Sequence, residues 1–267
     1  KFKLKPKQLF YVTEYITGQD LGTMWHLASK RRQGKRLDKI RINLAILSLV
    51  ENGMAYLHHE YNMAHKSLKP SNIMIYADNR VKITDVGIVD ICNKSGATSS
   101  TTSGKKASSQ ITVGNETHVI TNETNILWYQ APEIMNKLEL NDEAWKKCDV
   151  YSFAVMLYQA ITLKPLLWQN LTDQQLIETI TNGQRLKLSE RFLKKPWVSF
   201  SQIITNCWEG DPTKRPCFKE LVAYQQESNR EKLEITGSIN QETTKTPKVH
   251  IRKTARQGRV SRFSKNK

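Results

Sequence analysis

The segment His-Lys-Ser-Leu-Lys-Pro-Ser-Asn at residues 65–72 decides how the rest of the chain is interpreted. On its N-terminal side, apolar residues recur from 38 to 60 at the 3.6-residue spacing of a long buried helix. On its C-terminal side, short apolar runs at 73–76 and 81–84 flank a polar turn, a pattern that predicts two antiparallel strands. Residues 65–72 are therefore expected to form a loop between a helix and a hairpin.

Further short motifs follow this loop. Asp-Val-Gly at 85–87 closes the strand pair, and Ala-Pro-Glu at 131–133 comes after a segment, 93–125, that is rich in Ser, Thr, Gly, Asn and Lys. We expect that segment to be a long mobile loop, since it has no helical pattern. Helical spacing resumes at 145–162, 172–182, 199–208 and 216–226.

The upstream region predicts one more strand and a short helix. The aromatic and β-branched run at 9–15 is typical of a strand, here ending in a connector that contains Gly18. Asp20 is expected to cap the helix that follows.

In this order, residues 65–72, 85–87 and 131–133 resemble the catalytic loop, the metal-binding triplet and the end of the activation segment of the eukaryotic protein kinase family. Lys-Cys-Asp-Val-Tyr-Ser-Phe at 147–153 resembles the start of that family's buried central helix. Residues 207–216 resemble its closing large-lobe motif, and 9–15 its last small-lobe strand. Each motif alone has little specificity, but six in the correct order and spacing make a chance match implausible.

The resemblance implies a site for ATP and Mg²⁺. Asn72 and Asp85 are implied as metal ligands, and hard oxygen ligands of this kind suit Mg²⁺. Lys69 is implied to neutralise the transferring phosphate. The residues implied to contact the nucleotide are Thr13, Glu14, Ile16, Asp20 and Met74.

Structural roles are implied for four other residues. Asp149 would hold the backbone of the catalytic loop, in which His65 is a structural residue. Glu133 and Arg215 match a buried ion pair that braces the large lobe.

The chain departs from the family pattern at the catalytic position. Ser67 stands where the family has the aspartate that orients the substrate hydroxyl, and loss of a general base typically costs about 10²–10⁴ in rate. Ile126 stands where Ser/Thr kinases carry a threonine, which Thr124 could replace only if the loop slipped by two residues. Lys66 replaces an arginine and Val86 a phenylalanine.

These departures predict a pseudokinase that acts as a signalling or interaction module with a protein partner. The alternative is an active or weakly active Ser/Thr-type protein kinase whose small lobe lies upstream. A Ser/Thr-rich segment at 95–124 is also a candidate for phosphorylation, with Lys66 or Lys105–Lys106 receiving the phosphate.

The expected fold class is mainly α with small β-hairpins (α+β): the large C-terminal lobe of the protein kinase fold, with the small lobe missing. No Gly-x-Gly-x-x-Gly loop or Val-Ala-x-Lys strand precedes Leu9, so weak ATP binding at best and no phosphate transfer are expected of this 267-residue chain. Residues 1–16 would be the last small-lobe strand and hinge, 17–226 the large lobe, and 227–267 a basic disordered tail.

Charge and composition add a third hypothesis of another class. The formal net charge of the 267-residue chain is +16, and nine Lys/Arg without any acid lie between 245 and 267. This tail predicts non-specific contacts with nucleic acid or anionic membranes. There is no transmembrane run and no signal-peptide pattern, so a cytoplasmic location with reduced cysteines is expected.

Overall fold

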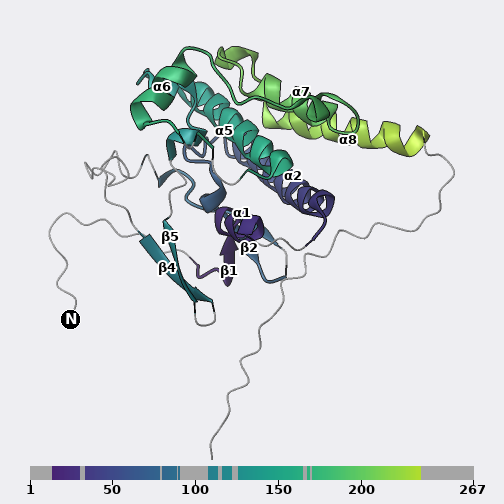
Figure 1. Cartoon of the computed structure of the whole chain (residues 1–267). Coiled ribbons are helices and arrows are strands. Elements are labelled where there is room, and N and C mark those ends of the chain that lie inside the picture. The colour runs from purple at the N-terminus through teal and green to yellow at the C-terminus, as the bar shows by residue number, and fades with distance from the viewer. Residues whose placement is uncertain are drawn as a thin grey trace, which may run out of the picture.

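The computed structural model describes residues 14–30, 34–78, 80–88, 90, 108–113, 116–121, 126–164, 167–168 and 170–235. This part of the chain is mainly helical, with a three-stranded sheet and a separate two-stranded hairpin (Figure 1). The helices are α1 (Leu21–Lys30), α2 (Arg36–Glu60), α4 (Pro132–Met135), α5 (Asp142–Thr162), α6 (Asp173–Thr181), α7 (Val198–Cys207) and α8 (Phe218–Ile235). The strands are β1 (Gly18–Asp20), β2 (Ile73–Tyr76), β3 (Val81–Ile83), β4 (Ser108–Val113) and β5 (Glu116–Thr121).

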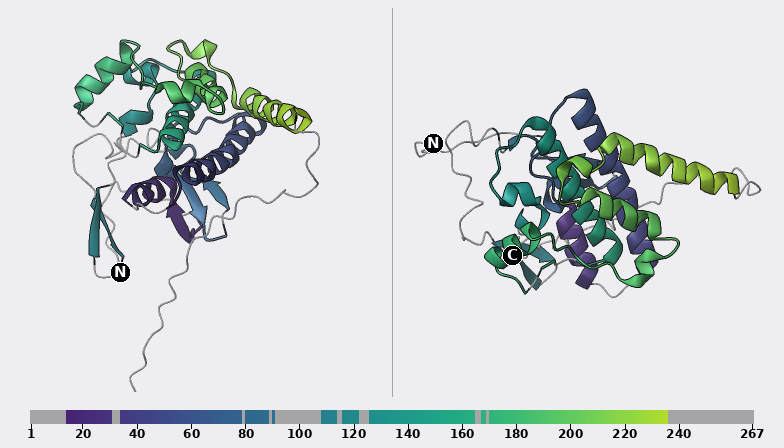
Figure 2. Two further views of the ribbon diagram at one scale, coloured as in Figure 1. Left: turned by 45° about the vertical axis from the view of Figure 1, so that its right-hand side comes forward. Right: turned by 90° about the horizontal axis from the view of Figure 1, so that it is seen from above.

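Helix α5 forms the centre of the hydrophobic core. Every side chain from Cys148 to Thr162 is buried, so this helix is surrounded by protein on all sides. It packs against α2 and α7, and α2 packs in turn against α8 (Figures 1 and 2). A helix that is apolar on all faces is expected only at such a central position. The helices predicted at 38–60 and 145–162 are therefore confirmed, each beginning a few residues earlier than expected.

The three-stranded sheet places the loop at 65–72 beside α1 and α2. Its order is β1–β2–β3, with all neighbours antiparallel, and its register pairs Ile73 with Ile83 and Asp20 with Met74. Strands β2 and β3 agree with the sequence prediction, but Gly18–Asp20 was expected to be a connector and helix cap only. A Cβ on Gly18 would lie 2.0 Å from the carbonyl oxygen of Ile75, so β1 can approach β2 only because residue 18 is glycine.

The Ser/Thr-rich segment 93–125 contains structure that the sequence analysis did not predict. Strands β4 and β5 pair antiparallel, with Ser108 opposite Thr121 and Val113 opposite Glu116. Both strands are rich in Thr, Val and Ile, and Gly114-Asn115 lies between them in sequence, a pattern that favours a hairpin. The expectation of a loop throughout was wrong for these strands, which project away from the helices (Figures 1 and 2).

Both ends of the predicted domain lie partly outside the described residues. The strand expected at 9–15 is one such case: only Glu14 and Tyr15 are described, neither lies in a strand, and Tyr15 is 89% exposed. At the other end, α8 continues to Ile235, past the expected start of the tail at 227. The basic segment 245–267 lies outside the described residues.

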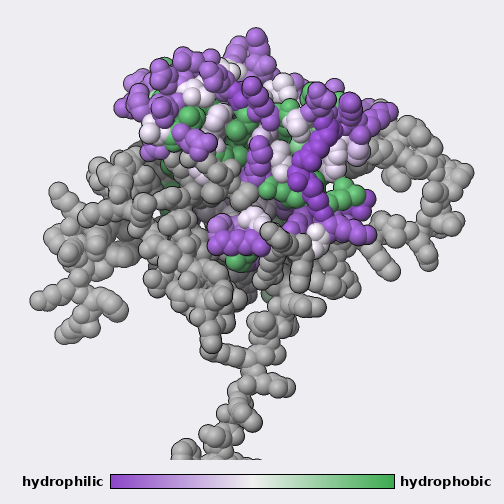
Figure 3. Space-filling view, viewed as in Figure 1, coloured by the Kyte–Doolittle hydropathy of each residue, from purple (hydrophilic) through white to green (hydrophobic). Residues whose placement is uncertain are grey.

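The helices present a mainly polar surface, and three of the cysteines lie in the described residues. Polar residues cover most of the helical face seen in Figure 3, and apolar residues appear there as separate patches. Of the helices in the described ranges, none is apolar over enough of its length to cross a bilayer. Cys148, Cys207 and Cys217 are free thiols.

One buried carboxyl lies between α2 and α8. Glu51 of α2 is 1% exposed, and its Oε2 accepts a hydrogen bond of 2.5 Å from Nε2 of Gln225 in α8. Its Oε1 has no hydrogen-bond partner among the described residues. Burial raises the pKa of Glu51 to about 8, so the folded protein keeps this carboxyl protonated at neutral pH.

We expect Glu51→Gln to stabilise the fold at pH 8 and to have little effect at pH 5. Between pH 4.5 and about 8 the folded state binds the Glu51 proton more tightly than the unfolded state, so wild-type stability falls as pH rises through this window. The free energy of unfolding of the variant minus that of wild type should be about 1–3 kcal/mol larger at pH 8 than at pH 5. Urea denaturation at both pH values measures this, and Glu60→Gln, on the exposed end of the same helix, is the control. An equal pH dependence in wild type and Glu51→Gln would contradict the assignment.

Candidate functional site

The loop 65–72 is attached to the core helix α5 through one carboxylate. Asp149 Oδ2 accepts the backbone N–H of His65 at 2.7 Å, and Oδ1 accepts that of Lys66 at 2.9 Å. The Nε2 of His58, near the end of α2, lies 2.9 Å from the same Oδ2. The Asp149 side chain is only 2% exposed, so these contacts are shielded from water. The backbone of the loop is thereby fixed to the most buried helix of the molecule.

Two residues of the site have left-handed backbone conformations. Lys66 has φ 68° and Asp85 has φ 63°. Aspartate tolerates this region, whereas for a lysine it is uncommon and requires support from the surrounding structure. The hydrogen bond from the Lys66 amide to Asp149 supplies part of that support.

We expect Asp149→Asn to lower the free energy of unfolding by about 2–4 kcal/mol, because an amide carries no charge and offers one oxygen acceptor where the carboxylate offers two. Hydrogen exchange of the His65 and Lys66 amides should quicken as well. Urea denaturation and amide exchange measure the two effects. Asp142→Asn is a matched control at an exposed position of α5, with a side chain that is 77% exposed. Equal stability of the two variants would contradict this account of the loop.

Asn72 connects the loop to the end of the strand pair. Its Nδ2 donates to the carbonyl oxygen of Ser67 at 2.8 Å and lies 3.4 Å from Ser67 Oγ. Its own carbonyl oxygen accepts the backbone N–H of Thr84 at 2.9 Å, which places Asp85 next to this junction. Among the described residues, none donates a hydrogen bond to the side-chain oxygen of Asn72, which is an acceptor.

Lys69 and Asp85 lie within electrostatic range of each other. Burial lowers the pKa of Lys69, and the negative charge of Asp85 opposes that shift. The site residues Ser67, Lys69, Asn72 and Asp85 therefore gather where the loop meets the end of the strand pair. His65 is completely buried beneath them, and its Nδ1 accepts the Ser67 amide at 3.2 Å.

Of the residues expected to contact a nucleotide, Asp20 lies in β1 and Met74 in β2, and Glu14 and Ile16 precede β1. Asp20 caps α1 as predicted: its Oδ1 accepts the backbone N–H of Thr23 at 2.9 Å and its Oδ2 accepts the Thr23 hydroxyl at 2.6 Å. Met74 is opposite Asp20 in the register, which brings these two residues together. Glu14 forms an ion pair with Lys82, which is opposite Met74 in the register of β2 and β3. Ile16 is half-buried in the segment between Glu14 and β1, and Thr13 lies outside the described residues.

Glu133 and Arg215 form a bidentate ion pair away from the loop. The two Nη atoms of Arg215 donate to Glu133 Oε1 at 2.6 Å and to Oε2 at 2.9 Å. The Arg215 side chain is 0% exposed and also donates to the carbonyl oxygens of Glu209 and Lys147. Burial acts to raise the pKa of Glu133, but the hydrogen bond and charge of Arg215 more than offset this and hold the pKa below its usual range.

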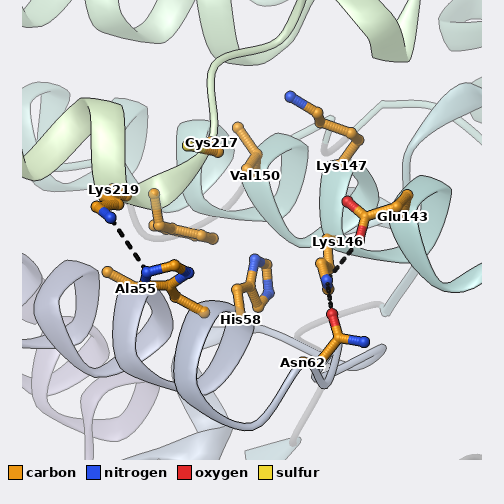
Figure 4. Close-up of a pocket in the computed structure, with 11 residues that line it drawn as sticks. Ala55, His58, Asn62, Glu143, Lys146, Lys147, Val150, Cys217 and Lys219 are labelled. Atoms are coloured by element: carbon orange, nitrogen blue, oxygen red, sulfur yellow. Dashed lines mark hydrogen bonds and ion pairs between the residues drawn. The ribbon is translucent and has the colours of Figure 1, made fainter.

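A cavity of about 310 Å³ lies on another side of this framework (Figure 4). It is lined by the end of α2, the start of α5 and the start of α8, with His58, Lys146 and Lys219 among its side chains. None of the residues given a catalytic, metal-binding or nucleotide-binding role from the sequence lines it, although Lys147 and Val150 of the motif at 147–153 do. The cavity is nonetheless connected to the loop at 65–72, because His58 in its lining contacts Asp149. The sequence did not predict this connection, since the two residues are 91 positions apart.

Comparison with known proteins identifies the family. The sequence model of the protein kinase domain family matches residues 1–225 of this chain. The chain is 33% identical over 171 residues to the dual specificity protein kinase shkE of Dictyostelium discoideum, an alignment that covers 64% of this chain and 20% of that protein. It is 30% identical over 217 residues to human receptor-interacting serine/threonine-protein kinase 1, covering 78% of this chain and 28% of that protein. For the serine/threonine-protein kinase CTR1 of Arabidopsis thaliana the identity is 29% over 220 residues, covering 82% of this chain and 23% of that protein.

The chain thus spans less than a third of the length of each of these relatives. The family match nevertheless extends over most of the chain and includes the loop 65–72, the Asp-Val-Gly triplet and the Glu133–Arg215 pair. The chain therefore belongs to the protein kinase domain family.

Proposed function

We propose that this chain supplies the large lobe of a protein kinase domain that binds ATP with Mg²⁺ but transfers the γ-phosphate poorly, so that it serves mainly as a signalling or interaction module. The observation that carries this proposal is the environment of Ser67. At the position of the catalytic aspartate there is a hydroxyl, which lies 3.4 Å from the Asn72 Nδ2 that donates to the Ser67 backbone carbonyl at 2.8 Å.

The serine limits the chemistry at this position. A serine hydroxyl has no negative charge at neutral pH and is a poor acceptor for the proton of a substrate hydroxyl. Positioning of the substrate hydroxyl would then depend on the other residues of the site, Lys69, Asn72 and Asp85. This is the physical basis for expecting slow transfer.

The residues present fit a magnesium ion held jointly with phosphate oxygens. Within the described residues, no group of three His, Cys, Asp or Glu side chains could hold a metal ion by itself. Mg²⁺ usually takes only one or two protein carboxylates or amides, together with waters and substrate phosphates. The Asp85 carboxylate and the Asn72 amide oxygen are such ligands, and the ion would neutralise charge on the phosphates.

An alternative function is that of an active or weakly active kinase directed at Ser/Thr hydroxyls. The grouping of Lys69, Asn72 and Asp85 favours it, because these groups suffice to bind the phosphates and their metal. The names of the relatives, which include two serine/threonine-protein kinases, also support a hydroxyl acceptor. Contacts of the basic segment 245–267 with anionic surfaces and a cytoplasmic location remain predictions.

The test uses the complete natural protein, with any residues that flank this chain. We expect ATP binding that requires Mg²⁺ and is lost in Asp85→Ala, measured by calorimetry, together with γ-phosphate transfer far slower than the 1–100 s⁻¹ typical of kinases, roughly below 0.01 s⁻¹. Transfer within the typical range, abolished by Asp85→Ala, would establish the alternative. Absence of ATP binding would leave only the interaction role.

A further inference from the structure

The side chain of Lys66 is held by an acid that the sequence did not single out. Its Nζ lies 2.8 Å from both carboxylate oxygens of Asp90, which follows the Asp-Val-Gly triplet. The Asp142 carboxylate is farther away, at 3.9 Å, and the ring of Trp145 lies 5.4 Å from the ammonium. The Lys66 side chain is 11% exposed, so the ammonium is largely withdrawn from water.

These contacts act on the residue immediately before Ser67. The Lys66 amide is bound to Asp149, and its side chain to Asp90, so the residue is held at both ends in its left-handed conformation. Because Asp149 belongs to α5 and Asp90 follows the triplet, Lys66 also connects the core helix to the segment after Asp85. Loss of the Asp90 charge would release one of the two attachments.

We propose that Asp90 is a positioning residue of the catalytic loop, and that its carboxylate takes the place that a phosphate on segment 93–125 would otherwise fill. The proposal rests on the proposed function, in that residues 65–72 are taken as the catalytic loop. A phosphate approaching Lys66 would have to displace a carboxylate that already binds the ammonium through both oxygens. The loop therefore keeps its conformation without phosphorylation, in contrast to the sequence-based hypothesis that Lys66 receives a phosphate.

The first test is hydrogen exchange of the His65 and Lys66 amides in the full chain, without nucleotide. Asp90→Asn removes the charge with little change of shape and should speed their exchange about fivefold. Asp90→Glu should stay close to wild type. Asp142→Asn is the matched control, since it removes the other nearby acid and should change exchange less than twofold. Exchange in Asp90→Asn that matches wild type would overturn the proposal, as would an equal effect of Asp142→Asn.

The second test asks whether an anion can replace the carboxylate. Inorganic phosphate should slow the exchange of these amides in Asp90→Asn, toward the wild-type rate, and leave wild type unchanged. In Lys66→Met, neither Asp90→Asn nor phosphate should have an effect. An equal response of wild type and Asp90→Asn to phosphate would overturn the proposal, because it would show that Lys66 is open to phosphate while Asp90 is present.

These measurements are separate from those that test the proposed function. They require neither ATP binding nor phosphate transfer, so a chain that binds no nucleotide can still show the Asp90 effect. Conversely, slow transfer with no Asp90 effect would leave the proposed function in place and remove only this inference.

Discussion

Replacement of Ser67 by aspartate raises the rate of γ-phosphate transfer by the complete natural protein about 10²–10⁴-fold, the contribution of a well-placed general base. The surroundings are suited to a carboxylate. The Nδ2 of Asn72 lies 3.4 Å from Ser67 Oγ, so it could donate a hydrogen bond to a carboxylate at this position. The half-buried Lys69 supplies positive charge nearby, and Asp149 already fixes the backbone on the N-terminal side.

The matched control for this prediction is Ser67→Asn, which has nearly the same size and shape as Ser67→Asp but no negative charge. Transfer to a peptide substrate is measured with radiolabelled ATP for wild type and both variants. If Ser67→Asp were no faster than Ser67→Asn, the serine would not be what limits transfer. The absence of a threonine at Ile126 would then be the next candidate, tested by adding Ile126→Thr.

Removal of the Arg215 side chain has the largest expected effect on stability. Arg215→Ala should lower the free energy of unfolding by about 3–5 kcal/mol, because it leaves the Glu133 carboxylate buried without its partner. Glu133 is 5% exposed, and the Cys148 thiol also donates to its carboxylate, at 3.1 Å. Without Arg215 the pKa of Glu133 should rise, since the largest opposition to the effect of burial would be removed.

Two further variants separate charge from geometry. Arg215→Lys keeps a positive charge but cannot form two parallel hydrogen bonds, so its stability in urea should lie between those of wild type and Arg215→Ala. The double variant Glu133→Gln with Arg215→Met removes both charges and should be more stable than Arg215→Ala alone. A double variant as unstable as Arg215→Ala would show that the cost comes from lost packing of the arginine.

Much of the fold and part of the site could be predicted because the relevant signals are local. The periodicity of α2 and α5 and the short runs of β2 and β3 are set by neighbouring residues, and the loop 65–72 follows from its place between them. Strand β1 was not predicted because it is only three residues long and because its close approach to β2 requires a glycine at position 18. Strands β4 and β5 were overlooked because the polar composition of the segment was given more weight than its β-branched residues.

Contacts between distant residues account for what the sequence could not predict in the site. Asp90 is an ordinary acid in the sequence, and only the chain path after β3 brings it to Lys66. The same holds for His58 and Asp149. The roles of Asn72, Lys69 and Asp85 were proposed from a resemblance, and the structure places these three residues together without testing what they bind.

Three consecutive residues at one turn of α5 contact three different parts of the chain. Lys147 donates to the carbonyl oxygen of Arg215, the Cys148 thiol donates to Glu133, and Asp149 accepts from the loop at 65–66. A small rotation of this turn would disturb all three connections at once. The loop at 65–72, the start of α4 and the segment before α8 are therefore connected through α5. We expect that loosening any one of them also disturbs the other two.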